Sequence, residues 1–431
     1  MTSGISRIAL ANGTRVVCEP MDHVRSVAVG CWVEAGGAFE EEHEQGLAHL
    51  LEHLVFKGTS RRTAREIARD IEGRGGSLGA FTEKEFCCYY AVVLDDHLGI
   101  AVDVLADLIL HYVFDEDQLA KEKGVVLEEI SDLEDTPEDL VHEIMARGLW
   151  PNHPIGTGLL GSRESVNGMT SEGVRAFWRR RYTPGTITVA AAGRVDPDEL
   201  RGLLDRWLVF GENGGAQGIM PSLSAARERL VIEQRPLAQV HLLLGARTDG
   251  ALAETRFPLL VYNAALGGGM GSRLFQTIRE NHGLVYSVYS HVSQMRDTGM
   301  LGVYFATDPS RLTDASALLA HELDQVCADG ITTDELAEAK EQIKGALVLS
   351  QESTSARMTR LATHEMYFGT HMGLDETLAA IDDVKLEQVT DIARSLFWEQ
   401  DPTVAMVGPA DSEPPALREG LIRSREGCRG V

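Results

Sequence analysis

The sequence predicts a mixed fold of helices and strands that is built from two related halves. Segments with β-strand character, such as 26–34 and 186–193, alternate with segments of helical periodicity. Two short motifs of the first half recur in the second at nearly the same offset, which is typical of an internal duplication. With 431 residues, of which 44% are hydrophobic and 24% charged, the chain is globular and long enough for two domains.

The recurring motifs indicate where one half ends and the next begins. The motif Asp115-x-x-Gln118-Leu119-Ala120 recurs in the second half as Thr332-x-x-Glu335-Leu336-Ala337, and segment 188–193 recurs as 403–408. Between the two copies, residues 211–218 are rich in glycine and have no periodicity, as in flexible linkers. We therefore predict an N-terminal domain over 1–212, a linker over 213–221 and a C-terminal domain over 222–431.

A pentapeptide in the first half predicts a zinc site. His49-Leu50-Leu51-Glu52-His53 lies in the strongly apolar stretch 46–56. On a helix that turns about 100° per residue, His49 and His53 lie about 40° apart, and Glu52 lies about 60° to the other side of His49. Two imidazoles on one helix face can hold Zn²⁺, and the glutamate between them can take a proton from the attacking water. The order H-x-x-E-H is the inverzincin signature. An amphipathic helix with two incidental histidines is the alternative.

A hydrolytic zinc site needs a third protein ligand, and segment 115–133 offers one. Asp115 and Gln118 predict a helix start. The following positions share one stripe: Leu119, Glu122, Val125, Val126, Glu129, Ile130 and Leu133. Glu128 points about 120° away from Glu122. Because an acid on an apolar stripe is costly unless it is paired or bound to a metal, we predict Glu129 as the third ligand and Glu122 as a second, catalytic carboxylate. A stripe-edge acid or salt-bridge partner is the alternative for Glu122.

These motifs resemble those of the pitrilysin/insulinase family of zinc metallopeptidases, particularly its two-domain bacterial members and the mitochondrial processing peptidase. The resemblance covers about residues 5–408, and its most specific parts are 49–59 and 122–129. The spacing from His53 to Glu129 equals the spacing that the family has between its second histidine and its third ligand. The resemblance implies an α+β fold of two homologous domains, each an antiparallel-rich sheet flanked by helices, which close like a clam around a chamber.

The second half differs from the first at the predicted metal site. When the two copies are aligned on the first recurring motif, Ala339 and Ala346 stand where the first half has Glu122 and Glu129, so we predict that the second half holds no metal. The resemblance implies that it contributes Arg279 and Tyr286 instead, which bind the substrate backbone and the developing oxyanion. Gly283 is expected to end the helix that carries Arg279, so that Tyr286 approaches from a strand. Without the resemblance, Arg279 is an ordinary exposed helix charge.

The resemblance also implies a strand in the first half that binds the substrate. Segment Gly79-Ala80-Phe81-Thr82 precedes the β-favouring run 86–93, and the family adds an extended peptide to such an edge. Relatives usually carry Asn at the position of Gly79, so a side-chain contact made there is absent from this chain. Main-chain pairing makes recognition tolerant of the peptide's sequence.

Composition and charge limit the partners and the compartment. The chain has 40 basic and 65 acidic residues, and the net charge of −25 argues against nucleic acid or an anionic membrane as a partner. Six cysteines without a C-x-x-C pair suit a reducing compartment. The N-terminus shows no apolar signal-peptide region, and no run is long enough for a membrane span. We expect a cytoplasmic protein, with a processed organellar form as the alternative.

Together, these observations predict a zinc-dependent endopeptidase with one Zn²⁺ per chain, which acts on unfolded peptides or presequences. His49, His53 and Glu129 hold the zinc, and Glu52 takes the proton of the attacking water and passes it to the leaving amine. One chain supplies half of the four-domain chamber that the larger relatives have, so a homodimer is expected. The alternatives are a processing enzyme for one presequence and a non-catalytic assembly scaffold.

Overall fold

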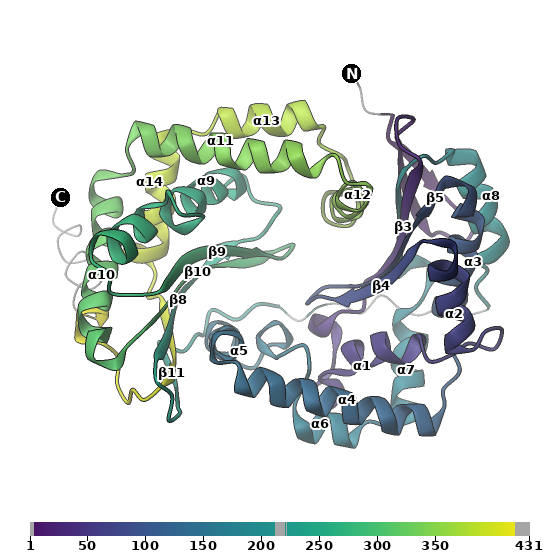
Figure 1. Ribbon diagram of the computed structural model, residues 1–431, viewed down its shortest axis with the longest axis horizontal. Helices are drawn as coiled ribbons and strands as arrows, with labels where there is room; N and C mark the ends of the chain where they lie inside the picture. Colours follow the sequence, from purple (N-terminus) through teal and green to yellow (C-terminus); the bar gives the residue numbers. More distant parts are fainter. Residues whose placement is uncertain (1–3, 212–219, 221, 419–431) are drawn as a thin grey trace. The chain divides into compact units, whose positions relative to one another are not determined.

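The computed structural model describes residues 4–211, 220 and 222–418, and it divides into two compact units. Each unit is one β-sheet with helices packed on it (Figure 1). The first unit comprises the chain up to residue 132 together with 153–223 and 350–373. The second unit comprises 133–152, 224–349 and the chain from residue 374 onward. The predicted mixed fold of two helix-flanked sheets is thus confirmed. The predicted linker, 213–221, lies outside the described residues except for residue 220.

The sheet of the first unit has six strands in the order β1-β2-β6-β3-β5-β4. All neighbours are antiparallel except β2 and β6, which run parallel. The strands are β1 (Ser6–Ala9), β2 (Arg15–Pro20), β3 (Ser26–Val33), β4 (Ser77–Thr82), β5 (Cys87–Leu94) and β6 (Ile187–Gly193). β3 and β6 are apolar and almost fully buried, as expected for central strands covered on both faces. β4 is an edge strand, since it is last in the order.

Helices cover both faces of this sheet. One face packs on a large apolar core that most helices of the unit share. These are α1 (Leu47–Val55), α2 (Ala64–Ile71), α3 (Leu98–Leu110), α4 (Glu116–Asp135), α6 (Arg163–Gly168), α7 (Ser171–Arg181) and α8 (Pro197–Trp207). The opposite face packs on α12 (Thr354–Phe368) through a second cluster that includes Trp32, Cys88 and Met358. Cys87 lies in the first core and Cys88 in the second, so the adjacent cysteines alternate between the faces of the sheet.

The sheet of the second unit has five strands in the order β7-β11-β8-β10-β9. They are β7 (Leu230–Gln234), β8 (Val240–Asp249), β9 (Ser287–Gln294), β10 (Thr298–Thr307) and β11 (Thr403–Gly408). One face shares a core with α9 (Arg256–Gly267), α10 (Leu312–Asp329), α11 (Thr333–Ser350), α13 (Leu374–Asp382) and α14 (Leu386–Arg394). The other face packs on α5 (Pro137–Leu149). Among the helices of the described residues, none is both long and apolar enough to cross a lipid bilayer.

The two sheets have the same topology, which supports the predicted duplication. From β2 to β4, and from β7 to β9, one parallel pair is followed by three antiparallel pairs. The repeated segments 188–193 and 403–408 form β6 and β11, which hold equivalent places in the two sheets. Only β1, at the edge of the first sheet, has no counterpart among the described strands of the second.

Equivalent helices of the two halves are exchanged between the units. α5 begins at Pro137 in the first half and belongs to the second unit, whereas α12 begins at the equivalent position of the second half, Thr354, and belongs to the first unit. Each helix covers the face of a sheet that the other helices of that unit leave open, and so buries its apolar residues. At these two helices, the compact units do not follow the sequence ranges 1–212 and 222–431.

Candidate active site

The H-x-x-E-H motif lies on the short helix α1, whose start is shaped by a buried carboxylate. The N-cap residue, Gly46, has a φ of 88°, and a Cβ there would lie 2.4 Å from the Leu160 carbonyl oxygen, so only glycine fits. The Glu40 carboxylate accepts hydrogen bonds from the N–H groups of Gly46 (2.9 Å) and Ala48 (2.6 Å). Burial raises the pKa of Glu40 to about 8, although these two bonds lower it. Leu50, Leu51 and Leu54 anchor the other side of α1 in the core.

The third predicted ligand lies on α4, which begins one residue after its predicted cap. The Gln118 N–H donates to Asp115 Oδ1 at 2.8 Å. The buried residues of this helix are Leu119, Glu122, Val126 and Ile130, whereas Glu128 is exposed. The prediction was wrong for Val125, which is 44% exposed, because the packed stripe is narrower than the predicted one. Glu122 and Glu129 lie two turns apart on the face that points toward the histidines of α1.

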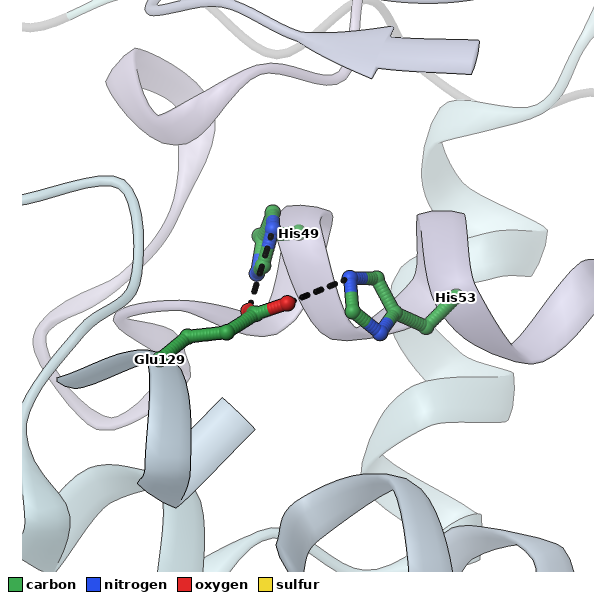
Figure 2. A group of neighbouring side chains, drawn as sticks. All are labelled: His49, His53 and Glu129. Atoms are coloured by element: carbon green, nitrogen blue, oxygen red, sulfur yellow. Dashed lines mark ion pairs between the residues drawn. The ribbon is translucent and has the colours of Figure 1, made fainter. Parts of the chain in front are cut away.

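His49, His53 and Glu129 converge from α1 and α4 (Figure 2). Glu129 lies between the two rings. Its Oε2 atom is 3.7 Å from His49 Nε2, and its Oε1 atom is 3.6 Å from His53 Nε2. The candidate ligand atoms of the three residues all lie within 4.8 Å of one another. These separations are too long for good hydrogen bonds, which measure about 2.7–3.2 Å.

The geometry and protonation of this cluster fit zinc. In a tetrahedral site with bonds of about 2.0–2.1 Å, ligand atoms lie roughly 3.4 Å apart, close to the two nitrogen–oxygen separations of 3.7 and 3.6 Å. Glu129 Oε2 is buried and has no hydrogen-bond partner among the described residues, which is costly unless a cation sits beside it. Burial and, to a lesser extent, His53 lower the pKa of His49 to about 4, so its imidazole is neutral and can act as a ligand. Two nitrogens and one oxygen leave a fourth position open, as in catalytic zinc sites.

Glu52 lies beside this cluster and is no member of it. Its Oε2 atom accepts a hydrogen bond of 2.5 Å from Thr82 Oγ1, at the end of β4. Burial raises the pKa of Glu52, and the bond from Thr82 opposes that shift. A carboxylate whose pKa is raised toward neutrality, next to a metal site, is suited to accept and return a proton.

Glu122 lies behind His53, where it contacts the imidazole nitrogen that points away from Glu129. Glu122 Oε2 is 3.4 Å from His53 Nδ1, and its Oε1 is 2.9 Å from Lys57 Nζ. Its side chain is only 7% exposed, so Lys57 supplies the charge that a buried carboxylate requires. A carboxylate on the second nitrogen of a metal-binding histidine fixes the orientation of the ring. This geometry favours a role in orienting His53 over direct contact with substrate.

Two of these contacts could not be predicted from the sequence. Lys57 lies two residues after the end of α1, so helix periodicity assigns it no neighbour. In the structure, its ammonium group pairs with Glu122 of α4. The resemblance implies substrate binding for Thr82, and the structure adds a hydrogen bond from its side chain to Glu52. Helix and strand periodicity describe one element at a time, so neither could reveal a contact between two elements.

The predicted substrate strand, Gly79 to Thr82, forms most of β4 and is half-buried along its length. β4 pairs with β5 on one side only, so its other edge is free in the described part of the chain. Ala80 packs toward the core that contains α1, whereas Phe81 packs with Phe86 on the opposite face. A Cβ on Gly79 would lie 2.9 Å from the ring of Tyr90, so this tyrosine occupies the space beside the glycine.

Arg279 and Tyr286 lie together in the second unit and do not belong to the group of candidate metal ligands. Arg279 is near the end of the π-helical segment η7 (Phe275–Asn281), and its guanidinium carbon is 5.4 Å from the centre of the Tyr286 ring. Gly283 has a φ of 60° and ends the helical stretch, as predicted. Tyr286 precedes β9 and is 80% exposed. A tyrosine with this much free surface is available to a ligand.

The chain matches the models of two protein families. The first, described as insulinase (peptidase family M16), matches residues 15–163, and the second, the peptidase M16 inactive domain, matches residues 168–343. The chain belongs to peptidase family M16. The resemblance to the pitrilysin/insulinase family is therefore confirmed. The first match contains all three residues of the metal cluster, and the inactive-domain match falls on the half in which alanines replace Glu122 and Glu129.

Relatives of similar length carry names that agree with this site. The "uncharacterized zinc protease YmxG" of Bacillus subtilis is 40% identical over 410 residues, which span 95% of this chain and all of that protein. An "uncharacterized zinc protease" of Mycobacterium leprae is 41% identical over 422 residues, or 97% of this chain and 95% of the relative. A solved structure, "a protease from Helicobacter pylori", has a TM-score of 0.86 at 20% identity and covers 94% of this chain and 100% of its own. That structure supports the fold.

Proposed function

We propose that this member of family M16 is a zinc-dependent endopeptidase that hydrolyses unfolded peptides or presequences, with one zinc per chain. The observation that supports this most is the convergence of His49, His53 and Glu129 beside Glu52. Zinc held by the first three would polarise the scissile carbonyl and acidify the attacking water. Glu52 takes the proton of that water and passes it to the leaving amine. The β4 edge pairs with the extended peptide backbone, which makes recognition tolerant of sequence.

The intact ligand set favours an enzyme over a non-catalytic assembly scaffold. A scaffold has no need of two histidines and a glutamate directed at one point, because such a group is costly without a metal. A processing enzyme for a single presequence would use the same chemistry, and it differs only in the range of peptides it accepts. We also propose a cytoplasmic location, because no disulfide links the cysteines among the described residues, as suits a reducing compartment.

Digestion of a mixed peptide library tests this proposal. We expect the purified protein to cut internal peptide bonds at many sites, to lose this activity when the metal is removed by a chelator, and to regain it on addition of about one equivalent of Zn²⁺ per chain. Mass spectrometry of the products gives the cleavage sites and distinguishes a broad peptidase from a processing enzyme. Cleavage that persists in the metal-free protein would contradict the zinc mechanism, and no cleavage of any peptide with zinc bound would favour the scaffold.

We further propose that Arg279 and Tyr286 bind the substrate backbone and the developing oxyanion. The Arg279 guanidinium lies over the ring of the exposed Tyr286, and the two side chains offer the donors that an oxyanion requires. Arg279→Ala and Tyr286→Phe should each lower kcat/KM by roughly ten-fold or more, because each removes one such contact. Zinc content should stay at the wild-type level. Measured kcat/KM near the wild-type value in both variants would contradict this role.

A mixed-chain experiment tests the proposed homodimer and which chain serves which site. Chains with Glu52→Gln are combined with chains that carry Arg279→Ala and Tyr286→Phe, and light scattering gives the assembly size. If each site uses residues of one chain, as we propose, mixed dimers show no more activity than the two parent proteins. If sites were shared between chains, about a quarter of wild-type activity would return in a random mixture, and the within-chain assignment would be wrong.

A further inference from the structure

We propose that Thr82 is a positioning residue for the proposed endopeptidase, which couples binding of a peptide on β4 to the orientation of Glu52. The inference rests on the proposed function. Its basis is that Thr82 offers its side chain to Glu52 and its backbone groups to the peptide. The side chain of Thr82 contacts Glu52, and, as the strand register implies, its backbone groups point to the free edge of the sheet.

The side-chain contact is specific. Thr82 Oγ1 donates to Glu52 Oε2 at 2.5 Å, and no other hydrogen-bond donor to this carboxylate is found among the described residues. Glu52 Oε1 is therefore left to accept a proton from water. The hydroxyl itself is held in place, because Thr82 is β-branched and lies on a regular strand, which restricts its side-chain rotamer. Behind it, Sγ of the buried Cys87 lies 3.4 Å from Oγ1.

The strand register gives the direction of the backbone groups. Thr82 faces Cys87 in the antiparallel pair of β4 and β5, and one residue further on the Glu83 N–H donates to the Phe86 carbonyl at 2.8 Å. In an antiparallel ladder, hydrogen-bonded and non-hydrogen-bonded pairs alternate. Glu83 and Phe86 form a hydrogen-bonded pair, so Thr82 and Cys87 form a non-hydrogen-bonded one. The N–H and C=O of Thr82 then project away from β5, and those of Ala80 do so two residues earlier.

These two observations connect the binding edge to the proton acceptor. A peptide that extends the sheet at β4 hydrogen-bonds with the outward backbone groups of Ala80 and Thr82. Such pairing restrains the end of the strand, which would otherwise have one free side. Restraint of Thr82 in turn restrains its hydroxyl and so the Glu52 carboxylate. Accurate orientation of a reacting group strongly affects rate, since a misplacement of about 1 Å can cost roughly a hundred-fold.

Replacing Thr82 by valine or by serine tests the proposal. Thr82→Val keeps the β-branched shape and removes the hydroxyl, so we expect kcat to fall by roughly ten-fold or more, with KM within about two-fold of the wild-type value and zinc content unchanged. Thr82→Ser restores the hydroxyl and should restore most of kcat. The matched control is Thr188→Val in β6 of the same sheet, because the buried Thr188 hydroxyl has no hydrogen-bond partner among the described residues. It should retain wild-type kcat.

A binding measurement distinguishes orientation from loss of the peptide site. In Glu52→Gln protein, which does not turn over, a labelled peptide should bind with the same Kd whether or not Thr82→Val is added, because the backbone groups make the contact. A much weaker Kd, loss of zinc, a rise in KM alone, or a serine variant as slow as the valine variant would overturn the proposal. If the wild-type protein cleaves peptides and the Thr82→Val protein has the same kcat, only this inference fails. If the wild-type protein cleaves none, the proposed function itself fails.

Discussion

Glu52→Gln is expected to abolish peptide cleavage and to leave zinc bound. Glu52 lies beside the metal cluster without belonging to it, so its neutral isostere removes the proton acceptor and keeps all three ligands. General acid–base catalysis by one side chain contributes about 10²–10⁴-fold, and the turnover number should fall by at least that much. Turnover is measured with a peptide that the wild-type protein cleaves, and zinc by elemental analysis of the purified variant.

The control for this experiment is the same substitution at an exposed helix position. Glu172 lies in the first turn of α7, is exposed and is not among the candidate metal ligands, so Glu172→Gln should keep both turnover and zinc. Two outcomes would contradict the role of Glu52. A Glu52→Gln protein that lacks zinc would make Glu52 a ligand, and one that cleaves at the wild-type rate would place the proton acceptor elsewhere.

Glu129→Ala is expected to empty the zinc site, whereas Glu128→Ala should have little effect. Glu129 lies between the rings of His49 and His53, and its neighbour Glu128 is exposed. Glu129 supplies a charged oxygen ligand to the metal. Its loss should lower zinc affinity by more than the roughly 10–100-fold that is typical when a residue that only orients a ligand is removed. Competition with a coloured chelator gives the zinc Kd of each variant. The two substitutions are chemically identical, so the comparison separates the metal contact from general loss of charge on α4.

Glu122→Ala provides an intermediate case on the same helix. Because Glu122 contacts His53 and Lys57, its removal frees the ring and leaves a lysine without its partner. We expect roughly ten-fold weaker zinc binding and a larger loss of turnover. A Glu128→Ala protein without zinc, together with a Glu129→Ala protein with full zinc, would show that Glu128 and not Glu129 faces the histidines of α1.

Local periodicity was sufficient to predict most of the candidate site. Residues four apart share a helix face, so His49 and His53 had to be neighbours once α1 formed. The same rule separated Glu129 from Glu128 on α4, and the structure places Glu129 against both histidines. It was less accurate at the margin of the stripe, where Val125 is exposed, because the width of a buried stripe depends on what packs against it.

The sequence by itself determined which residues can act as ligands, where the two helices of the metal site and a few of the strands lie, and that two motifs recur along the chain. Each of these depends on patterns within a few residues or on repetition along the chain. Only the tertiary structure decided the pairing of Lys57 with Glu122, the bond from Thr82 to Glu52, and the exchange of α5 and α12 between the sheets. These features depend on which surfaces meet after folding. An apolar face or a buried charge needs a partner. Because many residues of the sequence are chemically equivalent as partners, packing decides which of them makes the contact.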